Sequence, residues 1–123
     1  MKLDYNYLKK ILIIMEENSE HEIRSFDLFR KLLGTEDIDD KTLGHLRVLN
    51  DFGCIDSQAD NLGIKECLNG QIMQGNTLYR LTSRGYEFLD ILKNDTIFNK
   101  IKNFAISNAW DIGKQLLITL ATR

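Results

Sequence analysis

The chain has 123 residues, 43% of them hydrophobic and 28% charged, which fits one soluble domain with its own core. Its formal net charge of −2 counts against a protein built mainly to hold nucleic-acid phosphates. No apolar run reaches the roughly 18 residues of a membrane-spanning helix. The apolar run at 11–15 is followed by two glutamates, without a cleavage site. A cytoplasmic protein that does not bind membranes is therefore expected.

Two helices are predicted in the first third of the chain. Residues 4–18 have apolar side chains at helical spacing, and Asp4 is a residue type that caps a helix N-terminus. A very short strand at 22–24 is expected next. Ser25 is predicted to cap a second helix, which ends at Gly34 because glycine adopts the left-handed conformation without a side-chain clash. The expected buried positions of the first helix are Leu8, Ile11, Leu12 and Met15.

A third helix is predicted over 41–52, capped by Asp39 or Asp40 and ended by Gly53. Its apolar residues recur at three-residue spacing, which places them on one buried face. Lys41 and His45 fall outside this face and are expected to be largely exposed. Two helices joined by a short polar turn, the second ending at glycine, are typical of a helix-turn-helix core. The expected buried face consists of Leu43, Leu46, Leu49 and Phe52.

The middle of the chain predicts a small β structure. Residues 54–57 should pair with 77–81, and residues 64–68 with 71–73. Asn69-Gly70 between the latter two segments is a strong signal for a two-residue type I′ hairpin turn. Thr82 is then expected to cap another helix, in which Gly85 permits a neighbouring element to approach closely.

Further helices are expected after a break at 94–96. Ile97, Phe98, Ile101 and Phe104 form one apolar stripe, a second break is expected at 107–108, and a last helix at 109–121. This last helix has a wider apolar face than a surface helix needs, which favours a homodimer. Its predicted dimer-interface residues are Trp110, Leu116, Leu117 and Leu120.

Residues 42–55 resemble the recognition helix and first wing strand of winged-helix DNA-binding proteins, where S-x-x-H-L-x-x-L-x-x-x-G-L-[IV] is common. Residues 44–49 have the H-L-x-x-L centre and 52–55 the end of that pattern. The implied fold is mainly α with a small β-hairpin wing (α+β), a winged helix-turn-helix with additional C-terminal helices. The domain would span 1–93, with an extension at 94–123 that packs on the core or forms a dimer interface.

A second resemblance covers nearly the whole chain. An uncharacterised family found in phages and prophages, catalogued as a domain of unknown function, has similar segments. The chain resembles it at residues 1–4 and 8–12, and at residues 80–90 followed by 94–98. Ser83 and Phe98 stand where tryptophan is expected, and Tyr86 where histidine is expected. The resemblance implies the fold and a mobile-element origin, but no activity.

Two functions remain open. The first is a phage-type winged-helix transcriptional regulator that binds double-stranded DNA, with contacts from the exposed side of the third helix and the base of the wing. The alternative is a winged-helix protein-interaction module, such as an inhibitor of a host or phage protein. Segment 34–66 has eight acids against three bases, and a DNA binder needs a continuous basic face. The predicted DNA-binding residues are Lys41, Thr42, His45, Arg47, Arg80 and Arg84.

Enzymatic and metal-binding motifs are absent from the sequence. The spacing of Cys54, Cys67, His21 and His45 matches no zinc motif, and the two cysteines are too few for a disulfide framework. No nucleophile elbow or H-E-x-x-H motif occurs. The chain is therefore expected to be a non-enzyme without a metal or cofactor.

Overall fold

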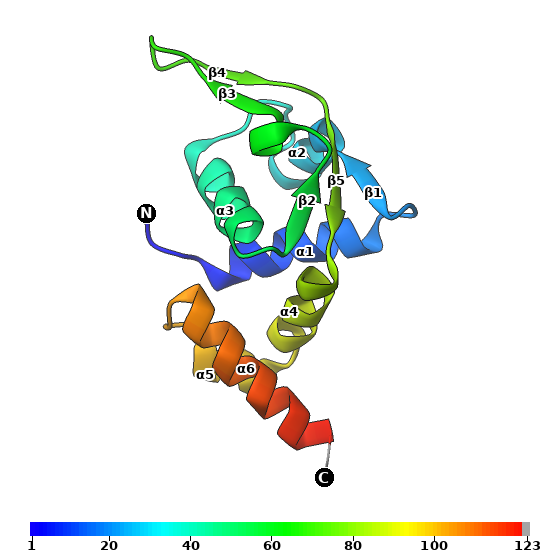
Figure 1. Ribbon diagram of the computed structural model, residues 1–123, viewed down its shortest axis with the longest axis vertical. Coiled ribbons are helices and arrows are strands. Elements are labelled where there is room, and N and C mark those ends of the chain that lie inside the picture. Colours follow the sequence, from blue (N-terminus) through cyan, green and yellow to red (C-terminus); the bar gives the residue numbers. More distant parts are fainter. Residues whose placement is uncertain (122–123) are drawn as a thin grey trace.

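The computed structural model describes residues 1–121, which form an α+β fold with six α-helices, a 3-10 helix and five short strands (Figure 1). The elements, in chain order, are α1 (Tyr5–Glu17), β1 (Glu22–Arg24), α2 (Ser25–Leu33), α3 (Asp40–Asp51), β2 (Ile55–Ser57), η1 (Asp60–Gly63), β3 (Ile64–Glu66), β4 (Ile72–Gln74), β5 (Leu78–Leu81), α4 (Ser83–Lys93), α5 (Asp95–Ile101) and α6 (Ile106–Ala121).

The strands form two small antiparallel sheets. Strand β5 lies in the middle of the first sheet, between β1 and β2, so that Tyr79 is opposite Ile23 on one side and Ser57 on the other. Strands β3 and β4 form a separate hairpin that projects from one end of the molecule (Figure 1). The predicted pairing of the segments around 54–57 and 77–81 is confirmed.

Most helix ends follow the local sequence signals. Asp4, Asp39, Thr82 and Asn94 each accept a backbone N–H of the first turn that follows, as N-cap side chains do. The prediction that Ser25 caps α2 is wrong. Ser25 is the buried first residue of α2, and its hydroxyl donates to the carbonyl of Gly75 while accepting the amide of Thr77.

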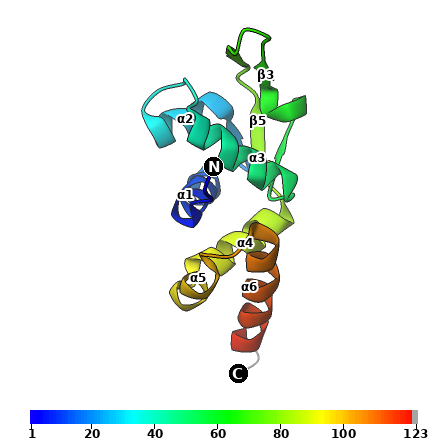
Figure 2. The same cartoon turned by 90° about the vertical axis from the view of Figure 1, so that its left-hand side faces the viewer.

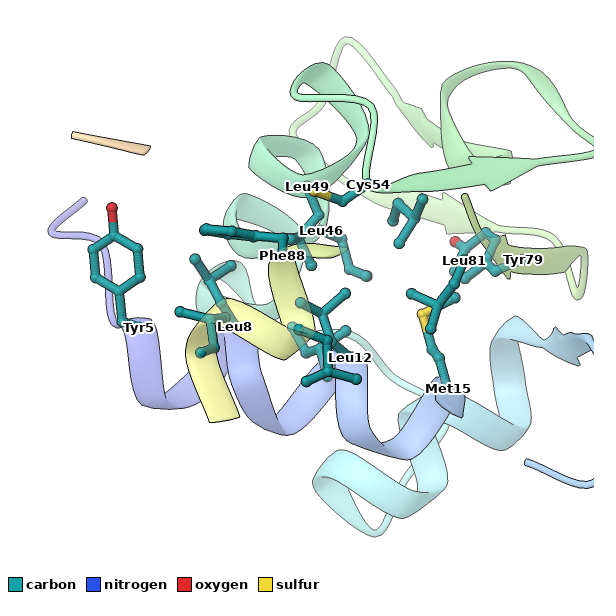
Figure 3. Close-up of a cluster of buried hydrophobic side chains, with 14 of the residues drawn as sticks. Tyr5, Leu8, Leu12, Met15, Leu46, Leu49, Cys54, Tyr79, Leu81 and Phe88 are labelled. Atoms are coloured by element: carbon teal, nitrogen blue, oxygen red, sulfur yellow. The ribbon is translucent and has the colours of Figure 1, made fainter. Parts of the chain in front are cut away.

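Helix α1 lies in the centre of the hydrophobic core, where it contacts α2, α3, α4 and β5. Its predicted buried residues, Leu8, Ile11, Leu12 and Met15, are all buried. Figure 3 shows Leu8 and Leu12 directed towards Leu46 of α3 and Phe88 of α4. One core therefore joins the first three helices to α4.

The buried face of α3 is largely as predicted. Leu43, Leu46 and Leu49 are buried, Phe52 is half-buried, and Lys41 is exposed. The prediction that His45 is exposed is wrong, because its side chain has no solvent-accessible surface. Helix α3 therefore buries a wider face than its leucine spacing indicates.

The β3–β4 hairpin forms as expected, but with a different turn. Gly70 has φ +82, whereas Asn69 does not have the positive φ that a type I′ turn requires. Instead the amide of Gly70 donates to the carbonyl of Cys67 and the amide of Cys67 donates to the carbonyl of Gln71. This is a three-residue loop in which one left-handed glycine closes the turn.

The last three helices lie together beneath α1, on the opposite side from the hairpin (Figure 2). The prediction of a helix break at 107–108 is wrong, since α6 begins at Ile106. Ser107 and Asn108 occupy its first turn, where their residue types are tolerated better than in a helix interior. Ala109, Trp110 and Gly113 form the buried face of α6.

Alanine substitution of Gly85 and of Gly44, two of the glycines that lie within helices, is predicted to have opposite effects on stability. A Cβ at Gly85 would lie 2.1 Å from the backbone oxygen of Cys54, so Gly85→Ala should lower the free energy of unfolding by about 3 kcal/mol or more. A Cβ at Gly44 meets the side chain of Met1, which is exposed and moves at little cost. Gly44→Ala should therefore leave stability unchanged or raise it by up to ~1 kcal/mol through helix propensity. Urea unfolding of both variants checks this, and equal effects would contradict the close approach at Gly85.

Candidate functional site

The segment that leads into α1 packs against the N-terminal half of α3 and is hydrogen-bonded to it. His45 Nε2 accepts a hydrogen bond from the backbone amide of Asp4 at 2.9 Å. Because Nε2 accepts, Nδ1 carries the proton and donates to the carbonyl of Lys41 at 2.7 Å. The ring also meets Tyr7 edge to face, with centroids 5.3 Å apart. His45 therefore joins α3 to α1 rather than facing solvent.

Neighbouring polar residues extend this contact. The Thr42 and Tyr7 hydroxyls are 2.5 Å apart, and Thr42 is fully buried. Lys41 remains exposed, with its Nζ 3.0 Å from Asp4 Oδ2 and 4.7 Å from the centre of the Tyr7 ring. The hydrogen bond from Lys41 lowers the pKa of Asp4 below its usual value. The hydrogen bond from Thr42 lowers the pKa of Asp39 in the same way.

The three arginines predicted to contact DNA each have a partner. Arg47 bonds Glu66 of β3 at 3.1 Å, and Arg80 bonds Asp56 of β2 at 3.1 Å. Arg80 is also opposite Glu22 of β1, so it stands between two acids of the sheet. The Arg84 guanidinium lies over two rings, 4.2 Å from the centre of Phe52 and 4.8 Å from that of Trp110.

The six predicted DNA-binding residues therefore do not form one basic face. Thr42 and His45 are buried within the fold, and Arg84 is stacked on rings that connect α3 to α6. Lys41, Arg47 and Arg80 each bond an acid from a different part of the chain. DNA contact by these residues stays a prediction.

A second candidate surface, which the sequence reasoning missed, is the tip of the β3–β4 hairpin, residues 67–73. Leu68 is fully exposed, Met73 is 61% exposed and Ile72 is 38% exposed. The sequence signal for this exposed surface is that apolar residues flank the Asn69-Gly70 turn on both sides. A hairpin that projects from the fold has no core in which to bury them. Their exposure is a mark of a contact site.

The base of this hairpin is held by hydrogen bonds to the connection between α2 and α3. The side chain of Gln74 accepts the amide of Ile38 and donates to the carbonyl of Glu36, both at 2.9 Å. Buried Tyr79 donates to the carbonyl of Leu62 at 2.6 Å, and Leu62 holds a left-handed conformation with φ +62. These contacts hold the hairpin beside the turn between α2 and α3.

That turn is acidic, and it is called the acidic turn below. It consists of Glu36, Asp37 and Asp39 of the connection together with Asp40, the first residue of α3, all of them exposed. Arg30 of α2 is paired with Glu36 of this turn and with Asp27 of its own helix. The acidic turn therefore lies beside the base of the hairpin, and the apolar tip projects beyond it.

The predicted dimer-interface residues do not share one environment. Trp110 is buried and packs against Phe52 and Phe88, with ring centroids 5.8 and 5.9 Å away. Leu116 and Leu117 are half-buried, and Leu120 is 41% exposed. Trp110 is therefore part of the core rather than of a surface open to a second chain, and the homodimer itself stays a prediction.

The described residues 1–121 contain no group of three or more His, Cys, Asp or Glu placed to hold a metal ion. Burial raises the pKa of the Cys54 thiol to about 12, which keeps it protonated at neutral pH. Over the same residues, no helix is long and apolar enough to cross a membrane.

Comparison with known proteins places this α+β chain in a family. The family described as hypothetical protein (DUF2513) matches residues 2–111, and the chain belongs to it. No curated protein and no solved structure matches. The family description names no activity, so a function has to be argued from the structure.

The buried imidazole predicts that His45→Leu destabilises the protein. Leucine fills a similar space but leaves the amide of Asp4 without its acceptor, which should cost about 1–3 kcal/mol in the free energy of unfolding. Lys41→Met removes an exposed ion pair with Asp4 and a cation–π contact with Tyr7, and should cost about 1 kcal/mol or less, because exposed contacts of both kinds contribute little. Urea unfolding compares the two, and a His45→Leu protein as stable as the parent would contradict the structural role.

The Asp4–Lys41 ion pair predicts a pH-dependent stability. The folded pKa of Asp4 is lowered, so its contribution is fully present above the unfolded pKa of about 4 and is lost as pH falls through the folded pKa. Asp4→Asn keeps a capping oxygen but loses the charge. The stability difference between parent and variant should be constant from pH 5 to 7 and shrink at pH 3. A difference independent of pH, measured by urea unfolding, would refute this coupling.

Proposed function

We propose that the chain is a winged helix-turn-helix protein. The support is the order of its elements: three helices with β1 after the first, then β2 and β5 paired around the β3–β4 hairpin. Helices α2 and α3 are joined by the short connection 34–39. The segment that resembles a recognition helix and wing strand, residues 42–55, coincides with α3 and the start of β2. The hairpin is then the wing.

The proposed function is that of a protein-interaction module, in which the hairpin tip enters an apolar pocket of a partner protein. The observation that carries this is the exposure of Leu68, Ile72 and Met73 on a hairpin whose base is held by hydrogen bonds. A pre-positioned apolar tip loses little conformational freedom on binding. The acidic turn beside it favours a partner whose pocket has a basic rim.

Electrostatics supports the same proposal. The paired acids lower the positive potential around Lys41, Arg47 and Arg80. The acidic turn at the N-terminal end of α3 repels phosphates at the place where a recognition helix approaches DNA. Non-specific DNA binding depends almost wholly on cation–phosphate contacts.

DNA binding by a phage-type transcriptional regulator is the second candidate, and the element order is the observation that favours it. Exposed ion pairs contribute only about 0–1 kcal/mol, so a phosphate can replace Asp4 at Lys41 or Glu66 at Arg47. Under this proposal the protein acts as a homodimer on paired half-sites. The exposed part of α6, which includes Ile118 and Leu120, would provide the contact.

One experiment separates the two functions. The protein, carrying the photo-crosslinker p-benzoylphenylalanine in place of Leu68, is irradiated in a lysate of the cells that produce it. We expect one discrete adduct, which Met73→Ser and added salt both weaken. Placing the crosslinker at Tyr86, an exposed aromatic position on α4, is the matched control and should give no such adduct.

Mobility-shift titration with mixed-sequence duplexes at about 50 mM salt is the second arm. The interaction module predicts no DNA binding in the micromolar range. If DNA binds, and if Arg47→Ala and Lys41→Ala each lower the log–log salt slope by about one unit, the regulator replaces the interaction module.

A further inference from the structure

A hollow of about 480 Å³ lies on another side of α3, away from the hairpin tip. Residues 1–6 form one wall, Lys41 of α3 contributes a second side, and Phe98, Lys102 and Asn103 at the end of α5 form the third. Its volume is within the range of about 300–1,000 Å³ typical of small-molecule sites. Lys41 is the one predicted DNA-binding residue in its lining, and no predicted function uses the hollow as a binding site.

Positive charge gathers here although the whole chain is negative. Lys2, Lys41 and Lys102 come from three separate segments, and Asp4 is the one acid that lines the hollow. Both oxygens of Asp4 are engaged, one with the amide of Tyr7 and one with Lys41. Within residues 1–121, Lys2 and Lys102 form no ion pair. The hollow therefore offers two cations that no carboxylate neutralises.

The remaining lining is partly apolar. The side chains of Met1, Leu3 and Phe98 lie among the polar groups. Lys9 stands over the Phe98 ring, 5.6 Å from its centre, and adds a further positive charge near this wall. A ligand that matches both features has an apolar or aromatic body and an anionic group.

The walls are held together by hydrogen bonds. The Tyr5 hydroxyl donates to the carbonyl of Phe104 at 2.7 Å, which fixes the start of α1 to the α5–α6 turn. Burial raises the pKa of Tyr5 to about 12, so this donor stays protonated at neutral pH. The amide of Asp4 is bonded to His45, which fixes the N-terminal segment to α3. The part of the hollow formed by Asp4 and Tyr5 is thus in place before a ligand binds, which lowers the cost of binding.

We propose that this hollow binds a small organic anion, one that has an apolar body and a carboxylate or phosphate group. The anionic group lies between Lys2 and Lys102, and the body lies against Leu3 and Phe98. The site is independent of the hairpin tip, so it stands whether or not the interaction module is correct.

The test is an NMR titration of the full ¹⁵N-labelled chain with 3-phenylpropionate, which has both features. Amide shifts are expected at residues lining the hollow, among them Asn6 and Asn103. The neutral analogue 3-phenylpropanol and the body-free anion acetate should each bind about tenfold more weakly or not at all. Phenyl phosphate, titrated in parallel, shows which anionic group is preferred.

The variant Lys2→Gln/Lys102→Gln should weaken 3-phenylpropionate binding about tenfold. Both side chains are exposed, so the fold should be retained. Lys31→Gln with Lys65→Gln is the matched control, because it removes the same charge from α2 and β3, and should leave the affinity unchanged. Equal binding of 3-phenylpropanol, unchanged affinity in the double variant, or shifts outside the hollow would each overturn the proposal.

Discussion

The burial of α1 against three other helices is the constraint on which the rest of the structure depends. Leu8, Ile11 and Leu12 have no exposed surface and belong to one continuous core, in which Leu8 and Leu12 face residues of α3 and α4 (Figure 3). Because protein cores are close-packed, the positions of α3 and α4 follow from this contact. The hairpin is attached to the turn before α3, and the hollow lies where α1 begins. Both candidate surfaces therefore depend on α1.

Asp4 adds a polar connection to this apolar one. Its side chain caps α1 and binds Lys41, while its backbone amide donates to His45. A single residue thus joins the N-terminal segment to the helix that resembles a recognition helix. The side of α3 that faces the N-terminus is part of the fold, so any contact with a partner there has to involve the side chains that remain outside this network.

Negative and positive side chains lie on different parts of the remaining surface. The acidic turn lies beside the base of the hairpin, and the hollow on another side of α3 is lined by Lys2 and Lys102, which form no ion pair within residues 1–121. The small net charge of the chain hides this separation, because opposite charges in different places cancel in the sum. A hairpin with an apolar tip and an acidic turn at its base, and a positive hollow with an apolar wall, are suited to different partners.

The sequence by itself determined the features that depend on neighbours within a few residues. Asp4 and Thr82 cap helices, and Gly34 and Gly53 end them, because the groups they satisfy lie within one turn of the chain. The spacing of Leu43, Leu46 and Leu49 also determined which side of α3 is buried. The secondary structure and the core were therefore largely predictable.

Tertiary structure decided where polar side chains went, because their partners are distant in the sequence. His45 is buried since the amide that satisfies it belongs to Asp4, 41 residues earlier. Ser25 bonds the chain at Gly75 and Thr77 instead of capping α2, for the same reason. The three lysines of the hollow come from residues 2, 41 and 102, a separation over which no local pattern operates. A histidine or lysine is stable both in solvent and against a suitable partner, and only the packing of distant segments supplies that partner.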